Sequence, residues 1–290
     1  MNGTPALRWR LVGEALRRYR EDMHYSLKDA AKILECDFSK LSRIETGNRG
    51  IRRIELRELL AEYGADDRAQ FVLCALANPL RLPGWWNEYP DVVRGDQRDM
   101  MVMESLAVNV FAYHAQQIPA LLQTKEYAAA IIGADPSTPS PSARQRMVEA
   151  LLARQKAILD AVAEPGLTVI IGEGALRQRA GGPDVMHSQL TRLAELCDSD
   201  SGVTVRVLPF DSAHPGFDGG GLTILTLAPP DLGIVHLAAF SGSFYLADRD
   251  DVGAYVTAFD QLREAALSAP DSAAMLRRLA TGETGADKAA

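Results

Sequence analysis

The stretch Leu27–Gly47, LKDAAKILECDFSKLSRIETG, decides the fold of the first part of this chain. Its apolar residues fall into two short runs at helical spacing, separated by residues 35–37. Ala31 supplies the small residue that two helices need where they cross, and Leu41 and Ile44 supply the inner face of the second helix. The stretch therefore predicts two short helices joined by a tight turn.

The second predicted helix also has a polar, cationic face. Its residues are spaced i, i+3, i+4 and i+7, opposite the apolar face, and they are Ser39, Ser42, Arg43 and Thr46. A face of this kind fits a DNA major groove, where its side chains can donate hydrogen bonds to base edges. Because any surface helix has a polar face, the argument depends on the helix, turn and helix occurring together.

Helix start and stop signals extend the pattern on both sides. Ser26 and Asp37 are typical N-cap residues, and Gly47 and Gly50 end the second motif helix. Apolar periodicity predicts five helices in all, at about 7–23, 27–34, 38–46, 54–63 and 67–76. Five short helices in so few residues make a compact unit.

A domain boundary is expected near residue 80, because Pro79, Pro83 and Gly84 interrupt the helical pattern there. A chain of 290 residues is long enough for two domains. We expect an N-terminal domain over residues 1–80, a C-terminal domain over 81–280 and a disordered tail over 281–290.

The C-terminal domain mixes helical patterns with β-branched runs bounded by Gly, Pro and Asp. Helices are predicted at about 104–116, 124–133, 142–163, 184–198 and 249–267, and strands at 167–171, 203–209, 222–228 and 234–240. This order predicts an α+β domain with a small sheet covered by helices, in a chain that is mainly α and α+β overall.

Charge is unevenly distributed along the chain. Residues 1–57 hold 13 Lys and Arg against 8 acidic residues, a net charge of +5, so the remaining 233 residues carry −12 of the total of −7. A basic first quarter joined to an acidic remainder indicates that any contact with nucleic acid lies in the first quarter.

The stretch Leu27–Gly47 resembles the helix-turn-helix of XRE-family, λ-repressor-like regulators, especially in its ending Ser-Arg-Ile-Glu-Thr-Gly at 42–47. The resemblance covers residues 10–75 and implies a five-helix DNA-binding domain. Three positions depart from the family pattern. Leu27 and Phe38 stand where the family often has Gln, and Glu35 stands where its turn commonly has Gly.

The candidate DNA-contacting residues follow from this helix-turn-helix. The polar face of the second motif helix is expected to read bases. Phosphate contacts are expected from its flanks and from the first helix. The residues expected to contact phosphates are Ser26, Lys40, Asn48, Arg49 and Arg52, and the first helix is expected to add one more contact through Arg17, Arg18 or Arg20.

The sequence also predicts the local environment of three residues near the turn and the second motif helix. Phe38 is expected to pack inward with Leu41, the alternative being a contact with a thymine methyl group. Glu45 is expected to pair internally with a nearby arginine, the alternative being a contact with cytosine. A left-handed conformation at Glu35 would cost on the order of 1 kcal/mol.

Residues 85–290 resemble the domain that follows XRE-type helix-turn-helix units in WhiJ-like regulators. The resemblance rests on GWW at 84–86, IPALLQT at 118–124, LARQ at 152–155, GGPDVM at 181–186 and VLPF at 207–210. It implies a regulator paired with a small protein from an adjacent gene, sometimes described in toxin–antitoxin terms.

No catalytic, metal or cofactor site is expected. The five histidines have no metal-ligand spacing, and the three cysteines form no CxxC pair. The Gly-Glu-Gly at 172–174 lacks the third glycine of a dinucleotide loop and is interpreted as a strand ending in a loop. A loop beginning at residue 214 could cover a pocket. Four residues are kept as candidate contacts of a ligand or partner, namely Trp85, Trp86, Tyr113 and His214.

The sequence thus predicts a cytoplasmic DNA-binding transcription regulator without a membrane span or signal peptide. Its C-terminal domain would receive a signal from a small partner protein or a ligand, and it would act as a homodimer on a two-fold double-stranded operator. The alternatives are an antitoxin-like scaffold that sequesters a partner protein, and an enzyme with an auxiliary helix-turn-helix.

Overall fold

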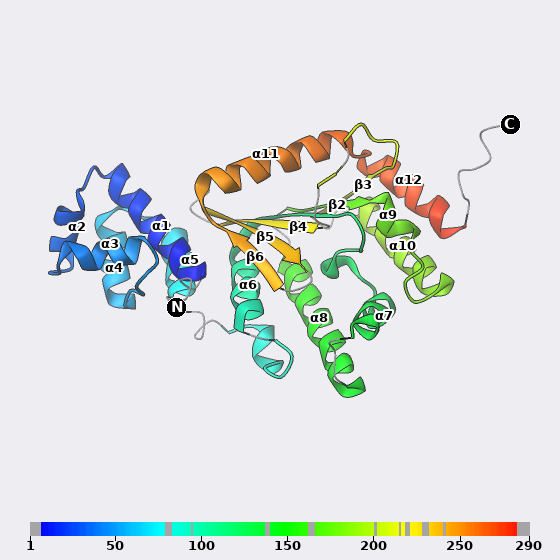
Figure 1. The fold of residues 1–290 in the computed structure, drawn as a ribbon, viewed down its shortest axis with the longest axis horizontal. Coiled ribbons are helices and arrows are strands. Elements are labelled where there is room, and N and C mark those ends of the chain that lie inside the picture. The colour runs from blue at the N-terminus through cyan, green and yellow to red at the C-terminus, as the bar shows by residue number, and fades with distance from the viewer. Residues whose placement is uncertain are drawn as a thin grey trace.

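The computed structural model describes most of the chain, namely residues 7–78, 83–93, 95–136, 140–161, 166–199, 202–214, 216–217, 221–227, 232–239 and 242–282. Five helices form the N-terminal domain (Figure 1). They are α1 (Leu7–Asp22), α2 (Leu27–Ile33), α3 (Phe38–Glu45), α4 (Arg53–Glu62) and α5 (Asp67–Ala77). The five predicted helices are therefore confirmed, each to within one or two residues.

Local capping explains where these helices begin. The side-chain oxygens of Ser26, Asp37 and Asp66 accept backbone N–H groups at the starts of α2, α3 and α5. Between α2 and α3 the chain turns through Glu35, whose φ of +46° lies in the left-handed region. The strained turn expected at Glu35 is therefore present.

The described residues after α5 form an α+β domain around one sheet (Figure 1). Its helices are α6 (Gly95–Leu106), α7 (Lys125–Ala134), α8 (Pro141–Ala161), α9 (Glu173–Arg177), α10 (Pro183–Asp198), α11 (Arg249–Ala265) and α12 (Ala269–Ala280). Its strands are β1 (Ala107–His114), β2 (Leu167–Gly172), β3 (Val203–Leu208), β4 (Gly221–Leu227), β5 (Leu232–Ala239) and β6 (Gly242–Leu246). The strand order is β3-β2-β1-β4-β5-β6, parallel from β3 to β1 and antiparallel from β1 to β6.

The two faces of the sheet are covered by different helices. Helix α11 lies across one face, where Phe111 of β1 packs its ring 5.4 Å from the ring of Phe259. Helices α6 and α8 lie on the opposite face (Figure 1). Because side chains alternate along a strand, Val110 and Ala112 of β1 point toward α6 and α8.

The predicted helix over 104–116 is wrong beyond its first three residues. Helix α6 ends at Leu106, and the chain continues directly into β1 at the centre of the sheet. Strand β1 pairs in parallel with β2 and antiparallel with β4, both distant in sequence. Pairing with such partners overrides the local helical pattern, so the sheet is larger than predicted.

Three further elements were not predicted. Strand β6 pairs with β5 at the sheet edge. Residues Glu173–Arg177 form the short helix α9 where a loop was expected. Helix α11 ends at Ala265, and α12 follows with Ser268 as its N-cap and proline in its first turn.

Several predictions fall outside the described residues. The boundary near residue 80 lies in 79–82, and most of the tail lies in 283–290. Of the loop predicted after residue 214, residues 215 and 218–220 also lie outside the described ranges.

Candidate nucleic-acid interface and ligand pocket

Helix α3 is held rigidly against α1. Its inner residues Leu41 and Ile44 are almost fully buried. Gly13 of α1 lets the two helices approach, because a Cβ at this position would lie 2.4 Å from the carbonyl oxygen of Ile44. Gly47 ends the helix with a φ of +72°, and a Cβ at this position would lie 2.9 Å from the backbone of Arg10. The close approach at Gly13 was not predicted, since the glycine lies inside a regular helical pattern.

A buried ion pair joins the same two helices. Arg20 of α1 donates from Nε and an Nη to both carboxylate oxygens of Glu45, at 2.7 and 2.9 Å, and the two side chains are 10% and 5% exposed. The other Nη of Arg20 donates to the carbonyl oxygen of Tyr25. The hydrogen bond from Arg20 to Glu45 raises the pKa of the guanidinium. The predicted internal partner of Glu45 is therefore Arg20, and the pair fixes the end of α3 on α1.

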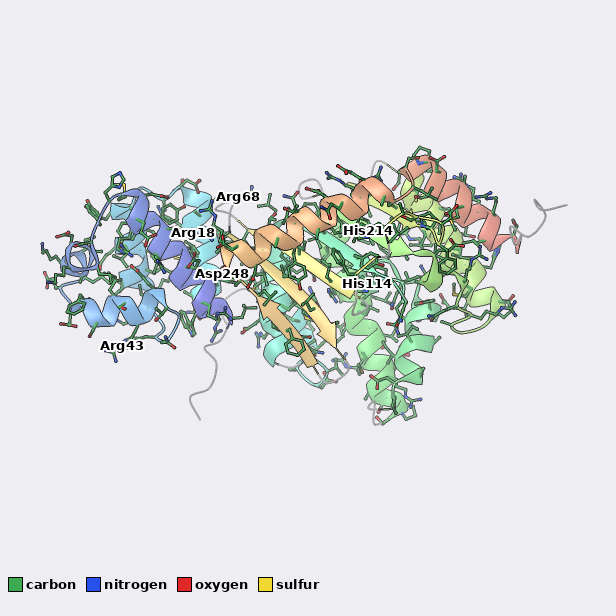
Figure 2. The ribbon with its side chains drawn as sticks, turned by 45° about the horizontal axis from the view of Figure 1, so that its top comes forward. Arg18, Arg43, Arg68, His114, His214 and Asp248 are labelled. Carbon is green, nitrogen blue, oxygen red and sulfur yellow. The ribbon has the colours of Figure 1, made fainter. Side chains whose placement is uncertain are left out.

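The outer face of α3 carries the residues expected to read bases. Ser39, Arg43 and Thr46 are exposed and Ser42 is half-buried. Arg43 lies clear of the C-terminal domain (Figure 2), and its Nε donates to the carbonyl oxygen of Ser39. Thr46 follows the last residue of α3 as its C-cap, and its hydroxyl donates to the carbonyl oxygen of Ser42. The structure thus brings all four side chains to one surface.

Two of the expected phosphate contacts are partly engaged within the protein. Lys40 Nζ donates to Glu55 Oε1 at 2.6 Å, and Arg52 donates to the same oxygen at 2.7 Å. Arg52 is also the N-cap of α4 and remains 82% exposed, whereas the Lys40 side chain is only 20% exposed. Hydrogen bonds from Arg52 and Lys40 lower the pKa of the buried Glu55 carboxyl to about 2.

The remaining flanking residues surround the same surface or lie apart from it. Asn48 and Arg49 directly follow α3 and are exposed; the Asn48 amide donates to Thr46 Oγ1. Ser26 is exposed at the start of α2. Arg17 pairs with Glu21 along α1.

The expectation for Phe38 is wrong. Its side chain is 48% exposed and does not pack inward with Leu41. Phe38 is the first residue of α3, one position after the cap Asp37, and it is three positions before Leu41. Since the inner surface there is already filled by Leu41, Phe38 is an apolar side chain next to the proposed reading face.

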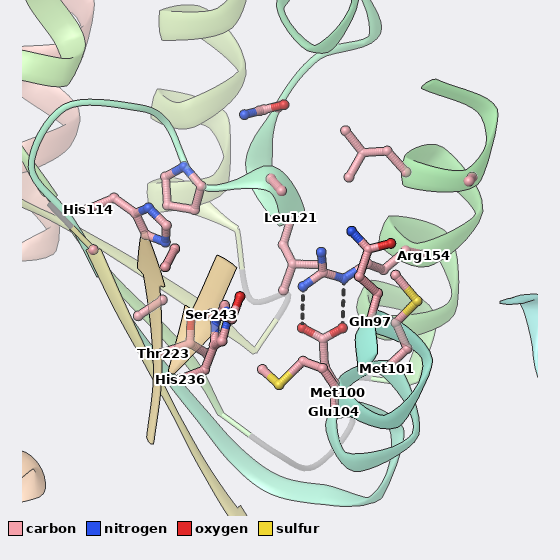
Figure 3. A pocket seen from close by; sticks show the side chains of 18 of the residues that line it. Gln97, Met100, Met101, Glu104, His114, Leu121, Arg154, Thr223, His236 and Ser243 are labelled. Atoms are coloured by element: carbon pink, nitrogen blue, oxygen red, sulfur yellow. Dashed lines mark hydrogen bonds and ion pairs between the residues drawn. The ribbon is translucent and has the colours of Figure 1, made fainter. Parts of the chain in front are cut away.

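A pocket of about 430 Å³ lies in the C-terminal domain, between α6, α8 and the sheet face opposite α11 (Figure 3). On its helix side, Arg154 of α8 donates through Nε and an Nη to the two oxygens of Glu104 of α6, both at 2.7 Å. Its wall on the sheet side includes two histidines, one from β1 and one from β5 (Figure 3). This pocket was not predicted, because its polar residues come from segments far apart in the sequence.

The four predicted ligand-contacting residues are not brought together. Trp85 lines the pocket, whereas Trp86 is buried beside it and does not line it. Tyr113 points to the other side of the sheet, where its ring lies 5.6 Å from that of Phe217. Tyr113 belongs to the core beneath α11, and the half-buried His214 contacts the other side of this arrangement through the ring of Phe217.

Two known protein families match different parts of the chain. Residues 11–71 match a helix-turn-helix domain, and residues 97–278 match a domain of unknown function, DUF5753. The fold and the helix-turn-helix define a DNA-binding regulator. The chain belongs to the DUF5753 family, whose model covers more than half of it. No curated protein and no solved structure matches the chain.

Two absences apply to the part of the chain that the structure describes. None of its helices combines the length and the hydrophobicity that a membrane span needs. Within the same ranges, no three His, Cys, Asp or Glu side chains lie close enough together to hold a metal ion.

Proposed function

We propose that the protein is a sequence-specific transcription regulator of the XRE type, in which α3 enters the major groove of an operator. The observation that carries the proposal is the exposed face formed by Ser39, Ser42, Arg43 and Thr46. This face lies on a helix whose other side is locked to α1 by buried packing and by the pair of Arg20 and Glu45. A rigid, cationic helix face is what direct readout of base edges requires.

The second part of the proposal is that the C-terminal domain receives a signal and passes it through α6. Arg8 of α1 forms an ion pair with Asp99 of α6, with 3.8 Å between Arg8 Nη1 and Asp99 Oδ1. Helix α6 also lines the pocket through Met100, Met101 and Glu104. A helix that contacts both the N-terminal domain and a pocket is suited to couple the two, because a shift at one end alters the contact at the other.

The resemblance to WhiJ-like regulators adds a small adjacent-gene protein as the second possible source of the signal. One α3 reads only a few base pairs, so the active form is proposed to be a cytoplasmic homodimer on a two-fold site. We infer that the chain is a binding protein and not an enzyme.

Binding to DNA is tested by fluorescence anisotropy of the full-length protein on its own upstream DNA and on scrambled DNA, over a series of salt concentrations. Selective binding that weakens steeply with salt is expected. The slope of log affinity against log salt is about −0.9 for each phosphate neutralised. Absence of selectivity, with and without the adjacent-gene protein, would overturn the proposal and favour the antitoxin-like scaffold.

One observation favours the enzyme alternative. Ser243 Oγ and His236 Nε2 are 2.9 Å apart at the pocket, and a histidine in this position can activate a serine nucleophile. Hydrolysis of a p-nitrophenyl ester that disappears in Ser243→Ala would support an enzyme. Equal background rates for Ser243→Ala and the unchanged protein would support the regulator.

A further inference from the structure

The pocket between α6, α8 and the sheet has the size of a small-molecule site. Its volume of about 430 Å³ lies within the roughly 300–1,000 Å³ of ligand pockets in proteins. Most of its wall is apolar; the two histidines and Ser243 supply hydrogen-bonding groups on the sheet side, and Gln97 of α6 supplies an amide on the helix side (Figure 3). Such a combination is typical of sites that bury an apolar ligand and orient it through a few polar contacts.

The charges of the pocket cancel. Among the described residues that line it, only two, Glu104 and Arg154, are of the Asp, Glu, Lys or Arg type. These two side chains form a bidentate ion pair with each other. The Glu104 side chain is only 1% exposed, so the carboxylate depends on Arg154 for its compensation. An ionic ligand would lose its hydration without meeting an unpaired opposite charge, and burying such a charge is costly.

The two histidines add hydrogen-bonding capacity without charge. Burial lowers the pKa of His114 to about 4, and burial also lowers the pKa of His236. Both imidazoles are therefore neutral near pH 7, and each has one N–H donor and one nitrogen acceptor. The hydroxyl of Ser243, 2.9 Å from His236 Nε2, extends this polar group toward the exposed edge strand.

The apolar wall can adapt to the shape of a ligand. Met100 and Met101 of α6 and Met147 of α8 face the pocket together with Leu121. Methionine side chains are flexible and polarisable, and they fit ligands of irregular shape better than branched side chains do.

We propose that this pocket binds an uncharged, largely apolar small molecule that carries a hydroxyl or carbonyl oxygen. The oxygen meets His114, His236 or Ser243 on the sheet side, and the apolar body lies against the methionines of α6 and α8. The inference rests on the proposed signal-receiving role of the C-terminal domain, since ligand binding here would act on α6.

The test uses two naphthalene probes that differ in charge and whose fluorescence increases in apolar surroundings. Prodan is an uncharged ketone, and anilinonaphthalene sulfonate is an anion. Prodan is expected to bind the full-length protein saturably, with one site per chain. Its affinity is expected to be at least about tenfold higher than that of the sulfonate, which meets no free counter-charge.

Two substitutions at the mouth of the pocket locate the site. Ala238 and Ser243 line the pocket but are exposed, so Ala238→Trp and Ser243→Trp fill the entrance without disturbing the core. Each is expected to weaken prodan binding at least about tenfold. The matched control is Ala254→Trp, at an exposed position of α11 on the other side of the sheet, which should leave prodan affinity unchanged.

Each outcome decides the inference. Tight binding of the anion, absence of saturable prodan binding, or binding that neither entrance variant weakens would overturn it. Prodan binding is measured without DNA, so its failure leaves the operator-binding result intact. Failure of operator binding with intact, entrance-dependent prodan binding would instead overturn the proposed regulator and keep the pocket.

Discussion

The ion pair between Arg20 and Glu45 gives the sharpest prediction for the N-terminal domain. Both side chains are buried. In Glu45→Ala the Arg20 guanidinium keeps the Tyr25 carbonyl oxygen and, at 3.4 Å, one carboxylate oxygen of Glu21 as partners. Removing one member of a buried pair costs about 3–5 kcal/mol, because the other charge stays buried. At about 1.4 kcal/mol for each tenfold change in an equilibrium, opening of α1 and α3 should become more than about a hundredfold easier.

Hydrogen-exchange mass spectrometry of the full-length protein measures this opening directly. Peptides from α1 and α3 should exchange more than about a hundredfold faster in Glu45→Ala, whereas peptides from the β-sheet should not change. The matched control is Glu21→Ala, which removes a 51% exposed partner of Arg17 and the 3.4 Å contact of Glu21 with Arg20, but leaves the buried pair of Arg20 and Glu45 in place. An exposed ion pair contributes about 0–1 kcal/mol to stability, so hydrogen exchange of the α1 and α3 peptides should rise by less than about fivefold in Glu21→Ala.

A double substitution separates the lost pair from a general packing defect. Arg20→Met combined with Glu45→Met removes both charges and fills the space with apolar atoms, so it should recover most of the lost protection. Exchange in Glu45→Ala within about threefold of the unchanged protein would refute the reasoning. A double variant that is less protected than Glu45→Ala would refute it equally.

Three other predictions concern the turn, the reading face and acid stability. Glu35→Gly relieves a left-handed backbone worth on the order of 1 kcal/mol and should raise the melting temperature by about 2 °C; an unchanged or lower value would count against the strain. Arg43→Ala should cost about 1–3 kcal/mol of discrimination between operator and scrambled DNA, whereas Arg49→Ala should weaken both alike and flatten the salt dependence. The pKa of Glu55 is about 2 in the folded protein against an ordinary 4.5, so its stabilising contribution is present above about pH 5 and is lost as the pH falls toward 2. Urea midpoints of the unchanged protein and Glu55→Gln should therefore differ most near neutral pH and converge only as the pH approaches about 2; a difference near pH 2 as large as that at neutral pH would contradict this.

The N-terminal domain could be predicted because its signals are local. Ser26 and Asp37 cap helices that begin one residue later, and the apolar residues between them and Ile44 repeat at helical spacing. The prediction for Phe38 is wrong because its apolar side chain follows a helix cap, whereas the inner surface at this point is filled by Leu41.

The C-terminal domain was predicted less completely because its decisive contacts are distant in sequence. Strand β1 is defined by neighbours such as Thr226, whose hydroxyl accepts a hydrogen bond from Asn109 across 117 positions. Glu104 and Arg154 are 50 positions apart, and each alone is an ordinary charged residue on a helix. No local pattern could have indicated that they would meet in a pocket.

The central claim is that the outer face of α3 contacts base edges, and crosslinking tests it most directly. A photo-crosslinking amino acid is placed at Ser39, on that face, and as a control at the exposed Asp251 of α11. Irradiation with the upstream DNA is expected to join position 39 to bases of a defined sequence and to leave position 251 unattached. Crosslinks from position 251, or none from position 39 under conditions where the protein is bound, would contradict the account.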